Sequence, residues 1–256
     1  MLVATLVKNN TVFKNLIHAV QDLTTNGHFF FDENSVILQA MDQSQVSLVV
    51  LNFEPEFFET YRCDHLITFE VNVGDLYKIL KFAEAEDFCT MAFLDCNEFI
   101  SFRFEDNKGR QQEASLKIFK TNNEKLLIPE QIFSCIIEML SAEFEKICRD
   151  ISSFSDTLII DADNLGITFR GTGYFATCKT TYARENCSND NIENCVGMTI
   201  KENANIEFAV KNLIILNSAC ANISKRILIS ITNNRPIILK YSFNNASFHF
   251  YLAPII

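Results

Sequence analysis

The sequence predicts an α+β fold made of two similar halves, and three observations lead to this expectation. Hydrophobic residues make up 48% and charged residues 21% of the 256 residues, which is typical of a chain that folds around a core. Most apolar stretches are short and strand-like, and only a few have helical spacing. One order of elements, namely a strand, a helix, three or four strands, a helix and three strands, occurs twice along the chain.

The first half is predicted to contain two helices among antiparallel strands. Val12, Leu16 and Val20 form an apolar stripe, so we expect a helix with Asn10 as its N-cap that reaches about residue 23. Leu76 belongs to a second stripe, which predicts a helix over residues 73–82. Strands are expected over residues 1–7, 27–32, 35–41, 45–53, 66–71, 88–95, 99–105 and 111–117.

The second half repeats this plan. Ser141 is expected to cap a helix that ends near residue 152 and turns Phe144 and Ile147 inward, and a further helix is expected over residues 210–222. Strands are expected over residues 133–140, 158–162, 166–171, 176–182, 195–201, 204–209, 226–232, 236–243 and 247–252.

A linker is predicted between the halves. Residues 120–125 are polar and have neither helical nor strand periodicity, and an apolar run from Leu126 to Ile128 follows them and stops at Pro129. Apolar residues in a linker need a covering surface, so we expect something to pack on them. The predicted domains are residues 1–117 and 135–256, with residues 118–134 as the linker.

The charge distribution is uneven. The chain has 22 Lys and Arg against 32 Asp and Glu, a formal charge of −10, which on average argues against a nucleic-acid partner. The outward faces of the four predicted helices nevertheless lean positive, and this favours a repeated basic surface. The basic residues on these faces are Lys14, Lys78, Lys81, Lys146, Arg149 and Lys211.

The cysteines and the N-terminus indicate a reducing compartment. Nine cysteines form no C-x-x-C pair and have no histidine at ligand spacing, which is typical of reduced thiols in a cytosolic or nuclear protein and gives no metal site. Residues 1–7 lack the basic start of a signal peptide, and no apolar run reaches membrane-spanning length. We therefore expect no membrane partner.

An enzyme is the main rival class of function. Residues 171–176 match a G-x-G-x-x-A dinucleotide motif after a strand, but the residues that follow have strand character, so no helix N-terminus would face a phosphate. The four histidines have no nucleophile or carboxylate at a recognisable spacing, and Cys148 sits on an apolar helix face. We expect a protein that is not an enzyme and needs no cofactor.

Six motifs resemble one family. Residues 38–48 read LQAMDQSQVSL, similar to the LQxMDxSHVxL segment of the proliferating cell nuclear antigen family, the sliding clamps of eukaryotic and archaeal replication. YRCD at 61–64, KILK at 78–81, IPEQ at 128–131, EFxxICRD at 143–150 and YLAP at 251–254 also match, in order along nearly the whole chain.

This resemblance implies a DNA-clamp fold, with two similar domains per subunit that close into a head-to-tail homotrimeric ring. The helices would line the hole and attract the phosphates of double-stranded DNA without reading sequence. Lys108 and Arg110 would join the six basic helix residues in this role. The subunit interface would join residues 111–117 of one copy to residues 175–182 of the next and would include Ala114, Leu116, Ile151, Phe154, Phe175 and Thr177.

The resemblance also implies a groove for short peptide motifs. The replicative DNA polymerase, the clamp loader and other PIP-box proteins would insert aromatic and aliphatic anchors beneath the linker. The groove would be formed by Met41, Gln45, Val46, Leu48, Leu126, Ile128, Pro129, Pro236, Tyr251, Leu252, Ala253, Pro254 and Ile256.

Two other clamp types remain as alternatives. Gln45 stands where the family usually has histidine, and Ala114 where a larger residue is common. A subunit of the heterotrimeric checkpoint clamp or a monomeric viral processivity factor would keep the fold. The complete IPEQ and YLAP motifs favour the replicative homotrimer, located in the nucleus or at a viral or parasite replication site.

Overall fold

The computed structural model describes residues 1–7, 9–94, 97–121, 124–129, 131–184 and 196–255. The chain divides into two compact units, one made of Met1–Leu127 with Phe243–Phe248 and the other of Ile128–Ser242 with His249–Ile256. The main division therefore lies inside the segment predicted as the linker.

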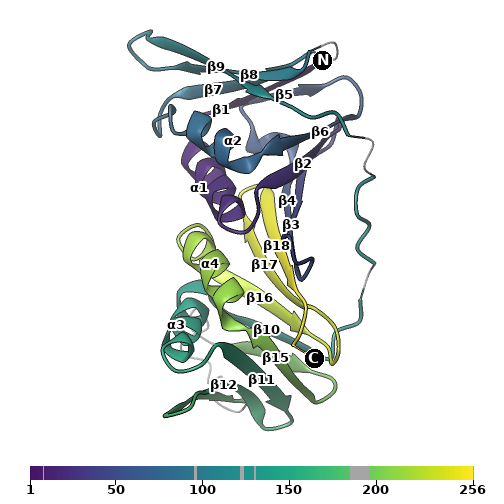
Figure 1. Ribbon diagram of the computed structural model, residues 1–256, viewed down its shortest axis with the longest axis vertical. Helices are drawn as coiled ribbons and strands as arrows, with labels where there is room; N and C mark the ends of the chain where they lie inside the picture. Colours follow the sequence, from purple (N-terminus) through teal and green to yellow (C-terminus); the bar gives the residue numbers. More distant parts are fainter. Residues whose placement is uncertain (8, 95–96, 122–123, 130, 185–195, 256) are drawn as a thin grey trace. The chain divides into compact units, whose positions relative to one another are not determined.

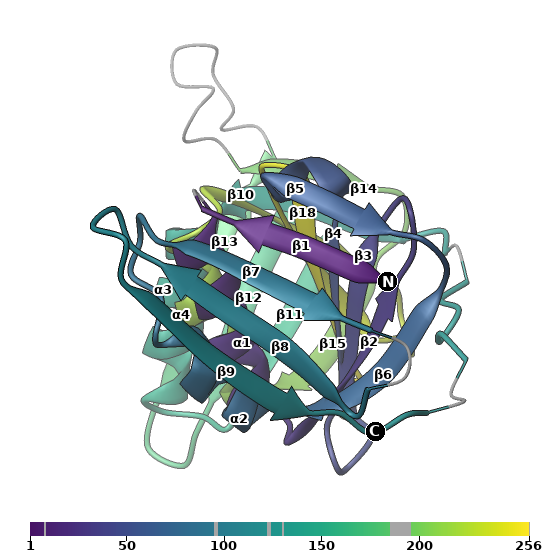
Figure 2. The ribbon, with the colours of Figure 1, turned by 90° about the horizontal axis from the view of Figure 1, so that it is seen from above.

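The first unit has an outer antiparallel sheet in the order β5-β1-β7-β8-β9, which Figure 2 shows from above. A second set of antiparallel strands runs β6-β2-β3-β4. Figure 1 shows the two helices side by side beneath the outer sheet. The elements are β1 (Leu2–Leu6), α1 (Asn10–Gln21), β2 (Asn26–Phe31), β3 (Val36–Met41), β4 (Ser47–Phe53), the 3-10 turn η1 (Pro55–Phe57), β5 (Thr60–Cys63), β6 (Ile67–Asn72), α2 (Val73–Leu80), β7 (Phe88–Phe93), β8 (Phe99–Glu105) and β9 (Gln111–Lys117).

Aromatic side chains fill the core of this unit. Phe31 lies 5.5 Å from Phe29 and 5.3 Å from Phe69, measured between ring centroids, and Phe69 lies 5.5 Å from Phe93. Tilted and offset rings at these distances attract one another beyond the effect of burial alone. Phe13 of α1 lies 5.3 Å from the Phe53 ring, so the same aromatic core holds the helix.

The second unit has the sheet β13-β12-β11-β15 and the strands β14-β10-β16-β17. Helices α3 and α4 pack against each other, and α3 contacts β10, β11 and β12. The elements are β10 (Cys135–Leu140), α3 (Ser141–Ser152), β11 (Thr157–Asp163), β12 (Gly166–Thr172), β13 (Thr177–Ala183), β14 (Gly197–Ile200), β15 (Ala204–Ala209), α4 (Val210–Cys220), β16 (Arg226–Ile231), β17 (Ile237–Phe243) and β18 (Ala246–Leu252).

The expected duplication is confirmed by the strand pairing as well as by the order of elements. In the first unit β1 pairs with β5 and β7, and β2 pairs with β3 and β6. In the second unit β10 pairs with β14 and β16, and β11 pairs with β12 and β15. β4 of the first unit therefore corresponds to β13 of the second.

Two predicted helix caps were wrong, because each helix already begins at the residue that was expected to precede it. Asn10 lies inside α1 and is 6% exposed, and its side-chain amide donates a hydrogen bond to the backbone carbonyl of Asp87. Ser141 is the first residue of α3 rather than its N-cap, and its buried hydroxyl has no hydrogen bond to any described residue. The prediction also missed β5, a four-residue strand in which only Cys63 is buried.

A buried polar chain ties α4 to β17 and α3 in the second unit. The Tyr241 hydroxyl donates to the side-chain oxygen of Asn217, and the Asn217 amide lies 3.6 Å from Cys148 Sγ. All three side chains have 0% exposure. Burial raises the pKa of the Tyr241 hydroxyl and of the Cys148 thiol, so both groups stay protonated at neutral pH.

The Tyr241→Phe variant should be destabilised by about 1–3 kcal/mol, because it removes the hydroxyl donor from a buried amide oxygen. Denaturant unfolding of the variant and the wild type measures this difference. Tyr174→Phe, in which the hydroxyl removed is on a side chain 94% exposed, is the matched control and should change stability little. Equal stability of Tyr241→Phe and the wild type would contradict the prediction.

Candidate functional site

A cavity of about 520 Å³ lies between the sheet of the first unit and the start of the linker. Strands β2, β3, β4 and β6 provide its floor, and Glu124 and Leu126 of the linker provide its wall. Three residues predicted for the client groove, Met41, Leu48 and Leu126, are brought together here. The full lining is Thr24, Thr25, Asn26, His28, Phe30, Gln39, Ala40, Met41, Gln43, Leu48, Glu70, Glu124 and Leu126.

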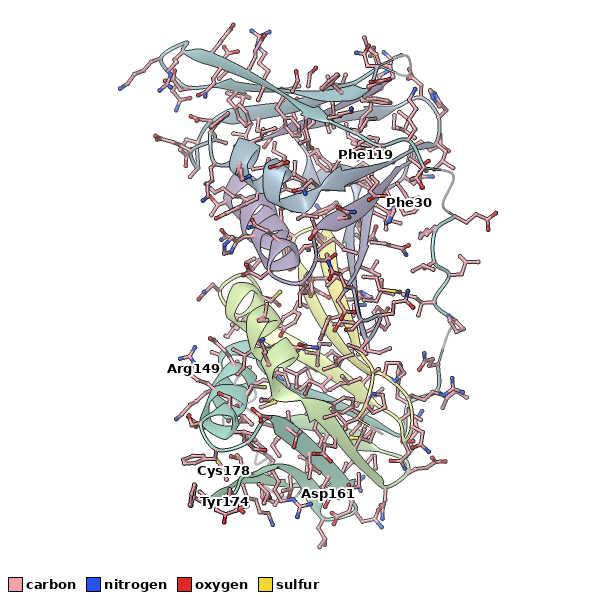
Figure 3. All side chains as sticks on the ribbon, viewed as in Figure 1. Phe30, Phe119, Arg149, Asp161, Tyr174 and Cys178 are labelled. Carbon is pink, nitrogen blue, oxygen red and sulfur yellow. The ribbon has the colours of Figure 1, made fainter. Side chains whose placement is uncertain are left out.

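The linker is attached to the sheet at two places. Phe119 and Glu70 of β6 exchange two backbone hydrogen bonds of 2.8 Å, and Thr68 Oγ1 donates to the carbonyl of Thr121 at 3.3 Å. Further along, the side-chain amide of Gln39 bonds to both backbone groups of Leu126, at 3.0 and 2.9 Å. These bonds explain how a segment without its own periodicity follows a defined path over the cavity. In Figure 3, Phe119 and Phe30 mark the part of the sheet beside this path.

The ionisable side chains that line the cavity are two carboxylates and one imidazole. They belong to Glu70, Glu124 and His28, and the lining has no lysine or arginine among the described residues. His28 Nδ1 lies 3.8 Å from Glu70 Oε2. Sequence reasoning missed this side of the cavity, because His28 and Glu70 are separate strand residues outside the matched motifs.

The other predicted groove residues divide between the two units. In the first unit, Val46 is 41% exposed, and Gln45 lies on the turn between β3 and β4 with a φ of 58°. In the second unit, Ile128, Pro236, Tyr251, Ala253 and Pro254 are half-buried and Pro129 is exposed. Leu252 is 1% exposed, so its side chain contributes to the core rather than to a surface. Ile256 lies outside the described residues.

The basic residues predicted on the helices of the first unit are on the surface, and each has a neighbour that already binds it. Lys78 Nζ lies 2.8 Å from Asp75 Oδ1, one turn away on α2. Lys81 lies 4.6 Å from the centre of the Tyr77 ring, and Lys14 donates to the Ala83 carbonyl at 3.2 Å. An exposed ion pair contributes only about 0–1 kcal/mol, so a phosphate can replace such a partner at little cost.

Lys146, Arg149 and Lys211 are exposed on the helices of the second unit. Figure 3 shows Arg149 on the outward face of α3, where its guanidinium pairs with Glu145. The prediction that these side chains point outward is confirmed for all three.

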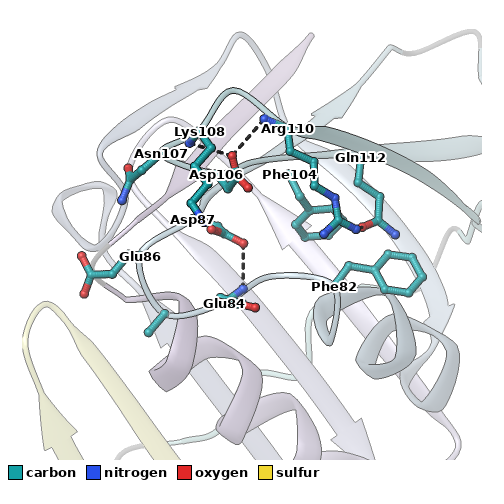
Figure 4. A pocket seen from close by; sticks show the side chains of 11 residues that line it. Phe82, Glu84, Glu86, Asp87, Phe104, Asp106, Asn107, Lys108, Arg110 and Gln112 are labelled. Carbon is teal, nitrogen blue, oxygen red and sulfur yellow. Dashed lines mark hydrogen bonds between the residues drawn. The ribbon is translucent and has the colours of Figure 1, made fainter.

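Lys108 and Arg110 have different surroundings from the helix residues. They lie at the turn between β8 and β9, beside a cavity of about 450 Å³ that Figure 4 shows from close by. Asp106 accepts hydrogen bonds from the backbone amides of Lys108 and Arg110, at 2.8 and 2.9 Å, and the Arg110 amide is the largest cause of its lowered pKa. Glu84, Glu86, Asp87 and Asp106 all line this cavity, so carboxylates outnumber the two basic residues.

The strands predicted for the subunit interface, β9 and β13, are both at the edge of their sheets. On β9, Ala114 is half-buried and Leu116 is 6% exposed, so Leu116 packs into the core of its own unit. In the second unit, Ile151 has 0% exposure and Thr177 is exposed. Leu116 and Ile151 can therefore support an interface only from beneath.

An aromatic cluster lies at the start of β13. Phe154 is 51% exposed, and Tyr174 and Phe175 are 94% and 95% exposed, with their ring centres 4.6 Å apart. Figure 3 shows Tyr174 at the end of the hairpin between β12 and β13. Sequence reasoning identified Phe154 and Phe175 but not Tyr174.

The glycines of the G-x-G-x-x-A string serve packing in this hairpin. A Cβ on Gly171 would lie 2.3 Å from the Ile151 side chain, and one on Gly173 would lie 1.7 Å from the Phe154 carbonyl oxygen. Both contacts are with the C-terminal end of α3 and the turn after it. As predicted, the string leads from β12 into β13, so no helix begins at this turn.

The described cysteines are free, and five of the six are buried. Burial raises the pKa of Cys89 to about 12 and that of Cys135 to about 11, so these thiols are unreactive at neutral pH. No cluster of three or more potential metal ligands occurs among the residues that the structure describes. Within the same ranges, no helix has the length and apolar character needed to cross a membrane.

Comparison with known proteins covers both halves of the chain. Residues 1–125 match the family model described as "Proliferating cell nuclear antigen, N-terminal domain", and residues 127–256 match the corresponding C-terminal domain. The chain is 34% identical over 249 residues to the proliferating cell nuclear antigen of Caenorhabditis elegans, which covers 96% of this chain and 94% of that protein. The repeated strand pairing, the two helices in each unit and these matches agree, and the chain belongs to the proliferating cell nuclear antigen family.

Proposed function

We propose that three copies of this chain close head to tail around duplex DNA and act as a sliding clamp and polymerase processivity factor. The clamp would tether replication and repair proteins through short peptide motifs. Processivity then comes from topology, because a closed ring cannot leave the DNA sideways, and tight binding to DNA is not needed.

The observation that carries the ring proposal is the pair of equivalent strands β4 and β13. Beyond β4, the sheet continues with β18, whose residues Ala246–Phe248 belong to the first unit. β13 has no such neighbour among the described strands, and β9, which corresponds to β18, is also an edge. If β13 of one copy paired with β9 of the next, the two strands would be neighbours in a sheet, as β4 and β18 are within one chain. A head-to-tail contact of this kind forms a ring when its rotation closes.

The basic helix residues support the DNA part of the proposal. Lysine and arginine attract phosphates without reading bases, which is the interaction that sliding tolerates. Lys14, Lys78, Lys81, Lys146, Arg149 and Lys211 would share this role. Lys108 and Arg110 would contribute less, because the carboxylates beside them oppose a phosphate.

The cavity under the linker supports the client-binding part of the proposal. Met41, Leu48 and Leu126 present apolar surface there. Covering ~300 Å² of apolar client surface at roughly 25 cal/mol/Å² contributes about 7 kcal/mol before ordering costs, which favours micromolar, exchangeable binding. Replicative polymerase, clamp loader and other PIP-box proteins are the proposed partners.

We propose a binding protein that is not an enzyme and needs no cofactor. The buried free thiols favour a reducing compartment, and a role in replication places the protein in the nucleus or at a viral or parasite replication site.

Light scattering of the purified chain should give a mass near three times 29.3 kDa, because β9 and β13 would each find a partner in a ring of three. A stable monomer at micromolar concentration would contradict the homotrimer and leave the checkpoint or viral alternative. Adding the Thr177→Pro change, which removes a backbone donor from β13, should reduce the mass to that of one chain.

Replacing Lys78, Lys81 and Arg149 together by alanine should weaken DNA binding and lower its dependence on salt. Each lost phosphate contact reduces, by about 0.9, the steepness with which the logarithm of the binding constant falls with the logarithm of the salt concentration. DNA-stimulated synthesis and loading onto nicked circular DNA measure the effect, while client-peptide affinity should not change.

The matched control replaces Lys201, Lys225 and Arg235, which are also exposed cations but lie outside the proposed DNA surface. Its loading should resemble that of the wild type. Equal defects in the two triple variants would show that net charge, rather than the helix surface, determines DNA binding.

The double change Leu126→Ser and Ile128→Ser should weaken client-peptide binding at least about a hundredfold and leave the trimer intact. Covering two aliphatic side chains contributes about 1.5–3 kcal/mol each, and serine loses that contribution. Fluorescence anisotropy with a labelled PIP-box peptide gives the affinity.

Leu66→Ser with Leu165→Ser is the control for this double change, since these leucines are 64% and 80% exposed and lie outside the groove. Client affinity that stays unchanged in the Leu126 and Ile128 variant would place the groove elsewhere.

A further inference from the structure

Gln39 is a buried polar residue in an otherwise apolar strand. It is 4% exposed on β3, and its strand neighbours Leu38 and Ala40 are 0% and 2% exposed. A buried amide that lacks hydrogen bonds is costly, so its partners are part of the reason for its presence. Gln39 is paired in the sheet with His28 on β2 and with Val50 on β4. The partners of its side chain therefore lie outside this strand pairing.

The side-chain partner is the backbone of Leu126, 87 residues further along the chain. Gln39 Nε2 donates to the Leu126 carbonyl at 3.0 Å, and Gln39 Oε1 accepts from the Leu126 amide at 2.9 Å. The amide side chain has one carbonyl and one N–H₂ group, so it presents the same donor and acceptor as a neighbouring strand. Both backbone groups of Leu126 are thereby held while its side chain stays 47% exposed.

The place of this contact along the linker makes it important. The first attachment, formed by the Phe119 backbone and the Thr121 carbonyl, lies before the cavity wall. The Gln39 contact lies at the wall itself, because Gln39 and Leu126 both line the cavity of about 520 Å³. The Leu126 side chain can form a fixed wall only if its backbone is fixed.

We propose that Gln39 is a positioning residue for client binding, which holds Leu126 at a set height above the sheet through its paired hydrogen bonds. This inference rests on the proposed client groove and names the residue that shapes it. Without the contact, the client would have to order the linker itself, and the ordering cost would reduce its affinity.

The first test uses Gln39→Leu, which has nearly the same volume and no hydrogen-bonding group. Its affinity for a fluorescein-labelled synthetic PIP-box peptide should fall by about ten- to hundredfold, as expected for two lost hydrogen bonds. Amide hydrogen exchange at Leu126 should become faster, while the trimer mass and the thermal unfolding of the strands should change little.

The second test uses Gln39→Glu and pH. At pH 8 the introduced carboxylate has no donor for the Leu126 carbonyl and repels it, so binding should be weak. A protonated carboxyl has one donor and one acceptor, as the amide does, so affinity should recover as the pH falls toward about 5.5. The usual glutamate pKa of about 4.3 is raised by burial, which brings the titration into this range.

Recovery at lower pH should be absent from the wild type and from Gln39→Leu. Gln43→Glu is the matched control, because Gln43 also lines the cavity and is exposed, so it adds the same charge without facing the Leu126 backbone. A recovery of equal size in Gln43→Glu would overturn the proposal, because the charge of the cavity alone would explain it.

Wild-type affinity and wild-type Leu126 exchange in Gln39→Leu would overturn the positioning role and leave the proposed clamp function standing. A flat pH profile in Gln39→Glu would also overturn it. If the wild type itself fails to bind the peptide, the client-binding function fails and the inference fails with it, and the Leu126 exchange rates still show whether the contact exists.

Discussion

In an antiparallel sheet, an interior strand has both rows of its backbone N–H and C=O groups paired, whereas an edge strand keeps one row for a further partner. This difference supports the proposed assembly of the chain. The two units use one pairing pattern, but β4 has a further neighbour and β13 does not. β9 is equivalent to β18, the strand that lies next to β4, and β9 is also an edge strand. The free edges of β13 and β9 therefore support the proposed contact between two copies of the chain, and the exposed Tyr174 and Phe175 add apolar surface beside β13.

Buried amide side chains form long-range contacts in both units. Asn10 joins α1 to the Asp87 carbonyl, Asn217 joins α4 to Tyr241, and Gln39 joins β3 to the linker. Asn10 and Gln39 satisfy backbone groups that regular secondary structure leaves open, and Asn217 accepts from the buried Tyr241 hydroxyl. Such contacts are directional, so they fix where a helix start or a linker lies more sharply than apolar packing does.

The elements and their order could be predicted from the sequence, because apolar spacing reports which face of each element is buried. Val12, Leu16 and Val20 were sufficient to identify α1, and the duplicated order followed from similar stripes. The cap at Asn10 could not be predicted, because its side chain bonds instead to the Asp87 carbonyl, 77 residues further along the chain. The family resemblance pointed to Met41, Leu48 and Leu126, but local sequence could not reveal that His28 and Glu70 share their cavity. Leu116 was expected at an interface, and only the fold reveals that the core of its own unit covers it.

The contact between Gln39 and Leu126 uses main-chain atoms on the linker side. Any residue except proline offers the same N–H and C=O at that position. The side chain at position 126 can therefore be substituted while the path of the linker stays constant. The choice of residue is restricted instead at position 39. A shorter asparagine would not reach the Leu126 backbone, and an apolar side chain could not form hydrogen bonds with it. In the proposed groove, the side chain of Leu126 can therefore vary, whereas the amide of Gln39 cannot.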